Sequence, residues 1–107
     1  MSKTVVDVLV VGGGVIGLTS AWFLAQRGLK VALLDKGQPG MGASWAGAGI
    51  IPPGNFAKAN TPNDKLRGRG YHLHPILHQK LLEETGIDNG FRVSGGLEFF
   101  LDGQGPN

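Results

Sequence analysis

The chain has 107 residues, 41% of them apolar and 17% charged, with a net charge of +2. This length suits one modest domain or part of one, and the composition is typical of a globular protein rather than a disordered or membrane-spanning one. Because the sequence has no cysteine, disulfides, thiolate nucleophiles and cysteine metal sites are excluded. The basic residues between positions 58 and 69 lie among glycine, asparagine and proline instead of aromatic residues, so nucleic-acid binding is not indicated.

The first elements follow a strand, helix, strand order. An apolar run from Val5 to Val11 predicts a strand buried on both faces of a parallel sheet. It is too short to span a bilayer and no signal-peptide cleavage site follows it, so we expect a cytoplasmic protein. From Gly14 the apolar spacing becomes helical, and we expect this helix to end at Arg27 with Gly28 as a left-handed cap. A second apolar run, Lys30 to Leu34, predicts a strand parallel to the first.

A loop and a helix start follow the second strand. Glycine, alanine and proline dominate residues 37–54, which predicts an extended loop. Thr61, with Pro62 and Asp64 behind it, is typical of a helix N-terminus, because threonine caps the first turn and the acid completes a capping box.

The last predicted elements are a flawed helix and a strand. Pro75 removes a helical hydrogen bond, so we expect a kink or break near His74 and a firmer helix from Pro75 to Thr85 that Gly86 stops. The sequence GGLEFFL, from Gly95 to Leu101, predicts a strand.

Three of the 19 glycines form the pattern Gly12-x-Gly14-x-x-Gly17 between the first strand and the helix, and Asp35 follows Gly17 by 18 residues. In such a motif the first glycine allows a tight turn, the second lets a pyrophosphate approach the backbone, and the third lets the helix pack on the sheet. The helix N-terminus attracts phosphate, and an acid in the place of Asp35 accepts ribose hydroxyls, which argues against NADP. The motif predicts a dinucleotide site without separating NAD from FAD; a glycine turn that binds nothing stays an alternative.

A second glycine-rich and alanine-rich segment, GASWAGAGII from Gly42 to Ile51, follows the second strand. It resembles the second such segment of the D-amino acid oxidase family of FAD-dependent oxidoreductases. Together with the first motif and the later LLEETGIDNGFRVSGGLEFFL, the resemblance covers essentially the whole chain and is nearest to the glycine oxidase, thiamine-pathway branch. It implies an α/β, Rossmann-like FAD/NAD(P)-binding fold, a βαβ unit with a parallel sheet, that is incomplete here. An antiparallel strand of a substrate domain would start near Ser94.

The resemblance also implies which residues hold FAD. The first motif would bind the pyrophosphate, the acid and its neighbour the adenosine ribose, and the second segment the phosphates or ribityl chain and the isoalloxazine ring. In that order the residues are Gly12, Gly14, Val15, Ile16 and Gly17; Asp35 and Lys36; Ala43 and Ser44; and Ala48, Gly49 and Ile50. Two departures stand out, because Asp35 replaces the usual glutamate and Trp45 is bulky where a small or polar residue is expected.

The implied chemistry is oxidation of a small amine-bearing acid, glycine or a D-amino acid, to an imine, with dioxygen or another acceptor reoxidising the flavin. The catalytic residues of such enzymes come from a later substrate domain, so we expect residues 1–107 to be the N-terminal part of a longer oxidase and inactive alone. A non-enzymatic or vestigial dinucleotide-binding module, a dehydrogenase and a 2-hydroxy acid oxidase stay alternatives. The oligomeric state is left open.

Other residues have simpler interpretations. His72, His74 and His78 have a spacing that Pro75 disrupts, so no metal site is expected. The neighbouring Glu83 and Glu84 point to different helix faces, which excludes a paired acid and base. Trp22 lies in the apolar stripe of the first helix, so we expect it in the core.

Overall fold

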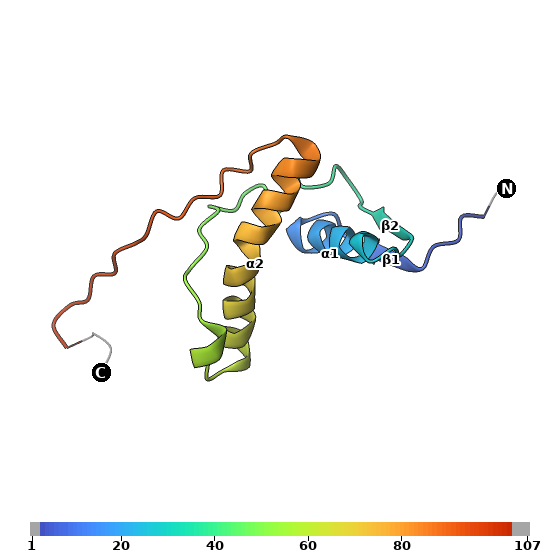
Figure 1. Cartoon of the computed structure of the whole chain (residues 1–107). Helices are drawn as coiled ribbons and strands as arrows, with labels where there is room; N and C mark the ends of the chain where they lie inside the picture. Colours follow the sequence, from blue (N-terminus) through green and yellow to red (C-terminus); the bar gives the residue numbers. More distant parts are fainter. Residues whose placement is uncertain (1–2, 104–107) are drawn as a thin grey trace. The chain divides into compact units, whose positions relative to one another are not determined.

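The structure, a computed structural model, describes residues 3–103, and the chain divides into two compact units, Met1–Ile50 and Ile51–Asn107. The first unit contains strand β1 (Val8–Val11), helix α1 (Val15–Gln26) and strand β2 (Val31–Leu34) (Figure 1). The second unit contains a 3-10 turn, η1 (Phe56–Lys58), and one long helix, α2 (Pro62–Thr85). The described residues therefore form a mixed α/β structure.

The first unit is a parallel βαβ motif, as predicted. The two strands pair in parallel from Val8 opposite Val31 to Val11 opposite Leu34, and α1 contacts both of them. Strand β1 begins three residues later than the apolar run suggests. Pairing starts at Val31, and ahead of it the Asp7 N–H donates to the Lys30 carbonyl over 2.9 Å while the Asp7 carboxylate accepts the Lys30 N–H over 2.8 Å.

The helix boundaries of α1 follow the glycines. Gly14 precedes the first helical residue in an extended conformation, Arg27 is the last flanking residue, and Gly28 has φ +82°. That positive φ is the left-handed conformation that glycine adopts without steric cost, so the predicted C-terminal cap is confirmed.

The predicted two-sided burial of β1 is wrong. Val8 and Val10 are partly buried, whereas Leu9 and Val11 are 54% and 80% exposed, which is the alternation of a sheet covered on one face. Trp22 is likewise only half-buried instead of lying in a core. No apolar side chain among residues 3–103 is fully buried. Two strands and one helix offer too few layers to enclose a core.

Helix α2 starts and stops as predicted. The Thr61 hydroxyl accepts the Asp64 N–H over 3.1 Å, Pro62 occupies the first turn, and Gly86 has φ +71° after the last residue. The break expected near His74 is absent, because α2 runs continuously from Pro62 to Thr85 with Pro75 inside it. Proline removes one N–H from the helical ladder, and the turns on either side keep theirs.

After α2, residues 87–103 continue without helix or strand (Figure 1). The strand expected from Gly95 to Leu101 is therefore not formed in this structure. A strand needs a partner for its backbone hydrogen bonds, and none pairs with this segment among residues 3–103, where Leu97 and Phe99 are 87% and 89% exposed. Within the same residues, neither helix has the length and apolar character needed to cross a membrane.

Candidate functional site

The chain turns sharply between β1 and α1 at Gly12. This residue has φ +108°, which side-chain-bearing residues rarely adopt, and its N–H donates to the Leu34 carbonyl over 2.7 Å. The turn therefore remains tied to the end of β2 while it reverses toward the helix.

Gly17 is fixed as glycine by the backbone opposite it. A Cβ at this position would lie 1.8 Å from the Gly12 carbonyl oxygen, closer than any real Cβ contact. The first turn of α1 thus packs directly on the turn after β1, which is the close packing predicted for the third glycine of the motif.

Gly14 leaves the N-terminus of α1 accessible. A Cβ there would meet only the Ser44 hydroxyl, at 3.2 Å, and no side chain at position 14 caps the helix. Instead, Ser44 Oγ accepts the Val15 N–H over 2.9 Å. The helix end presents N–H groups and its positive dipole to whatever lies in front of Gly14, which favours a phosphate group.

Gly13, which the motif leaves unspecified, is the only buried residue of the described part of this unit. Its N–H donates to Asp35 Oδ2 over 2.7 Å, and its carbonyl accepts the Gly40 N–H over 2.7 Å. A Cβ would lie 3.1 Å from Cβ of Pro39 and 3.2 Å from Asp35 Oδ2. Sequence reasoning missed this residue, although the run of three consecutive glycines was a visible signal.

Asp35 is exposed and holds two backbone N–H groups. Its Oδ2 accepts from Gly13 and its Oδ1 from Gly37, over 2.7 and 2.8 Å. These two hydrogen bonds, that of Gly13 first, lower the pKa of the Asp35 carboxyl below its ordinary value of 3.8, with a smaller contribution from the charge of Lys36. The carboxylate is therefore ionised at neutral pH, and through Gly13 it holds the loop of Gly12 to Gly14 between β1 and α1, which we call the glycine loop.

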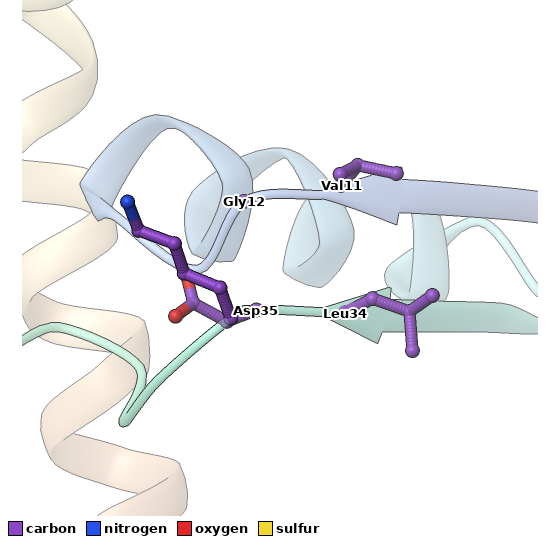
Figure 2. Close-up of a pocket in the computed structure, with 5 residues that line it drawn as sticks. Val11, Gly12, Leu34 and Asp35 are labelled. Atoms are coloured by element: carbon purple, nitrogen blue, oxygen red, sulfur yellow. The ribbon is translucent and has the colours of Figure 1, made fainter.

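An open hollow of about 420 Å³ lies at the carboxyl ends of the two strands. Figure 2 shows Gly12 following Val11 on one strand and Asp35 following Leu34 on the other, side by side at the same edge. Lys36 completes the lining. Ligands of open parallel sheets bind at this edge, and the volume is within the range of small-molecule sites. Apolar walls with an acid at one end suit a nucleoside, whose base is flat and whose ribose donates hydroxyl hydrogens.

The second segment reaches this site only in part. The turn at residues 43–46 brings Ser44 to the start of α1, with Ala43 beside it in sequence. Gly49 has φ +71°, and Ala48, Gly49 and Ile50 are exposed without a hydrogen bond to the glycine loop. The Trp45 side chain is 71% exposed, so its bulk does not crowd the turn. The structure thus brings together residues predicted for pyrophosphate and ribose, whereas no hydrogen bond joins those predicted for the isoalloxazine ring to them within the described part of the chain.

Two of the three histidines on α2 contact the segment that follows this helix, whereas His72 is exposed and lies edge-on to the ring of Tyr71. The ring of His74 stacks on Phe91, with centroids 6.3 Å apart and an interplanar angle of 5°, and His78 Nδ1 lies 2.6 Å from Asn89 Oδ1. Among residues 3–103, no three histidine or acidic side chains gather as metal ligands would.

Comparison with protein families shows a match of residues 7–106 to the model described as FAD dependent oxidoreductase (DAO). The chain is 41% identical over 97 residues to a glycine oxidase of Pseudomonas aeruginosa, and 40% identical over 89 residues to one of Geobacillus kaustophilus. These alignments cover 91% and 83% of this chain but 27% and 24% of the two relatives. The chain thus spans about a quarter of their length.

A third relative carries a different name. A D-amino acid dehydrogenase of a Methylobacterium species is 48% identical over 62 residues, covering 56% of this chain and 14% of the relative. No solved structure matches the chain.

Proposed function

Because the chain belongs to the DAO family of FAD-dependent oxidoreductases, we propose that it forms the N-terminal part of the FAD-binding domain of an enzyme that oxidises small amine-bearing acids. Family membership and the glycine oxidase relatives imply FAD as the cofactor. The single structural observation that supports the proposal is the glycine turn between β1 and α1, where Gly17 permits backbone contact and Gly14 leaves space in front of the helix.

The residues around this turn fit the diphosphate of FAD. The N–H groups of Val15 and Ile16 belong to the first turn of α1, where the positive end of the helix dipole stabilises negative charge. Gly12 and Gly14 have no side chain to occupy the space that the diphosphate needs. The Ser44 hydroxyl lies at the same helix end, with Ala43 next to it in sequence, and is a further donor that we assign to the diphosphate.

Asp35 and Lys36 are assigned to the adenosine end of the cofactor. Each carboxylate oxygen of Asp35 accepts one backbone hydrogen bond, and each has a further lone pair with which it accepts a ribose hydroxyl. Val11 and Leu34 give the same hollow its apolar walls. Ala48, Gly49 and Ile50 are assigned to the isoalloxazine ring, because small residues let the backbone approach a flat ring.

When bound, FAD supplies the acceptor for the two electrons of the substrate. The reaction we propose removes a hydride from the amine-bearing carbon and a proton from its nitrogen, which leaves an imine that water converts to a keto acid and ammonia. The electrons pass to dioxygen as hydrogen peroxide. Glycine is the first substrate to test, because two of the relatives are named glycine oxidase; a D-amino acid is the other.

A dehydrogenase, with an electron acceptor other than dioxygen, is a second candidate. It is favoured by the D-amino acid dehydrogenase relative, whose identity of 48% over 62 residues is the highest of the three. Both candidates share the FAD site and differ in what reoxidises the reduced cofactor.

The first test is the absorbance spectrum of the purified intact protein after gel filtration, followed by anaerobic addition of glycine, D-alanine or L-alanine. We expect a retained flavin band that glycine or D-alanine bleaches and L-alanine, the control of equal size, does not. Formation of peroxide when air is readmitted identifies an oxidase. If no peroxide forms and the flavin band returns only after a quinone is added, the enzyme is a dehydrogenase. A protein that retains no flavin contradicts the proposal.

A further inference from the structure

A second hollow, of about 260 Å³, lies within the unit Ile51–Asn107, between the segment 53–60 and the first turns of α2. It shares no residue with the glycine loop. Two cationic side chains line it, Lys58 from the end of η1 and Arg67 from α2. This hollow is not part of the proposed FAD site, and the reaction proposed above does not use it.

A close backbone crossing holds the two walls of the hollow together. Gly68 is buried, and a Cβ there would lie 2.5 Å from the Phe56 nitrogen; a Cβ at Gly54 would lie 3.0 Å from Cα of Gly68. The guanidinium of Arg69 lies 4.5 Å from the centre of the Phe56 ring on the same crossing. The segment that bears Lys58 is therefore fastened to the helix that bears Arg67.

The charges of the hollow favour an anion. Asp64 is its only acid, and the Asp64 carboxylate already accepts the Thr61 hydroxyl over 2.6 Å at the N-terminus of α2. Neither Lys58 nor Arg67 forms an ion pair with any residue between 3 and 103. Lys58 and Arg67 outnumber the one carboxylate, so the lining side chains carry a net positive charge, and an anion between the two cations relieves their mutual repulsion.

The remaining polar groups are suited to oxygen atoms. Asn55 and Asn60 also line the hollow, and their amides supply N–H donors. The Asn55 Oδ1 accepts the N–H groups of Ala57 and Lys58 over 3.0 and 3.3 Å, which fixes this side chain at the start of η1 and leaves its NH2 group as the donor. Arginine presents a planar fork that matches two oxygens of one carboxylate or phosphate.

We propose that Lys58 and Arg67 bind a small oxyanion, the carboxylate or phosphate group of a free metabolite, in this hollow. Arg67 holds two of its oxygens, Lys58 neutralises its charge, and the Asn55 amide donates to a remaining oxygen. The site is independent of the FAD-binding function, since it lies wholly in the other unit.

The test is isothermal titration of the intact protein with inorganic phosphate and, separately, with acetate, so that the two sources of the oxyanion are distinguished by which one binds more tightly. We expect saturable binding that Arg67→Ala or Lys58→Ala weakens about tenfold, the effect of losing one charged hydrogen-bond partner. Lys65→Ala removes the same charge from the same helix without touching the hollow, and we expect less than about a twofold change.

Three results would overturn the proposal. These are no saturable binding of either anion, an equal loss in all three variants, which indicates diffuse attraction to a basic surface, and binding that survives in both Lys58→Ala and Arg67→Ala, which places the anion elsewhere. Circular dichroism of each variant checks that α2 is intact, and the exposed positions of all three side chains make loss of folding unexpected.

Discussion

Gly14 and Gly17, the last two glycines of the motif, have different roles, and an alanine at each position separates these roles. At position 17 the added methyl would be 1.8 Å from the Gly12 carbonyl oxygen, so the turn or the helix must move. At position 14 it would meet only Ser44 Oγ at 3.2 Å, a contact that a small rotation of the serine relieves. We therefore expect Gly17→Ala to damage the fold and Gly14→Ala to damage ligand binding.

The magnitudes follow from these contacts. Overpacking against a well-fixed neighbour costs about 1 to 3 kcal/mol, and because the neighbour here is backbone, Gly17→Ala belongs at the upper end. The gain from alanine in a helix, about 0.5 to 1 kcal/mol, does not offset this cost. Gly14→Ala keeps a permitted φ of −79°, so its cost in stability is below about 1 kcal/mol. If its methyl removes one hydrogen bond from a charged phosphate, FAD affinity falls about 10-fold to 100-fold.

Urea denaturation followed by circular dichroism measures the first quantity, and quenching of FAD fluorescence on binding measures the second. The expected pattern is a lower denaturation midpoint for Gly17→Ala and a normal midpoint with weak FAD binding for Gly14→Ala. If Gly17→Ala is as stable as the parent and binds FAD equally well, the backbone contact in the structure is wrong. Equal losses of both quantities in both variants would show that the two glycines share one role.

Three further predictions concern other contacts. Gly68→Ala should lower the free energy of unfolding by about 1 to 3 kcal/mol, because its Cβ would lie 2.5 Å from the Phe56 backbone. Gly70→Ala lies in the same helix with open space around its Cβ and should raise the free energy of unfolding by up to about 1 kcal/mol. Equal stability of the two variants in urea denaturation contradicts this prediction. Ser44→Ala removes the acceptor of the Val15 N–H and should cost about 1 kcal/mol of stability and weaken FAD binding, and an unchanged affinity would exclude Ser44 from the site. The lowered pKa of Asp35 means that its contribution to stability is present above about pH 4 and is lost as pH falls through the folded-state pKa, which carboxyl NMR titration measures. Because the Asp35 carboxylate accepts the Gly13 N–H, we expect this amide to exchange slowly at neutral pH and to lose that protection in Asp35→Ala, which removes both acceptors.

The elements that sequence predicted well are those with local signals. The caps at Thr61, Gly28 and Gly86 depend on a hydroxyl or a positive φ at one position, and the structure has all three. The strand at Gly95 to Leu101 depends instead on a partner strand, which an apolar pattern cannot supply. The break predicted at Pro75 was wrong, because a 24-residue helix keeps its remaining hydrogen bonds when one proline removes a single donor.

The site was predictable to a similar extent. Gly12, Gly14 and Gly17 and the acid at position 35 follow from a spacing that reflects one ligand geometry. Gly13 and Gly68 were missed because each must be glycine on account of a group that a Cβ would meet. These groups, Asp35 at Gly13 and the Phe56 backbone at Gly68, are distant in sequence. The hydrogen bond of Ser44 to Val15 spans 29 residues and was equally out of reach of pattern analysis.

Two side chains that we assign to FAD, Asp35 and Ser44, also accept hydrogen bonds from the turn between β1 and α1, and this bears on how the cofactor binds. Asp35 accepts the Gly13 N–H, and Ser44 accepts the Val15 N–H, so the protein's own side chains hold this turn. Neither group is exhausted by its contact, since a carboxylate oxygen has a second lone pair and a serine that accepts through its oxygen still has a hydrogen to donate. Ribose can therefore add to the hydrogen bonds of Asp35, and a phosphate can accept the Ser44 hydroxyl hydrogen or take over the Val15 N–H that Ser44 accepts. A turn that the protein's own hydrogen bonds hold in place loses little conformational freedom when a ligand binds, so variants of Asp35 and Ser44 should change the affinity for FAD directly.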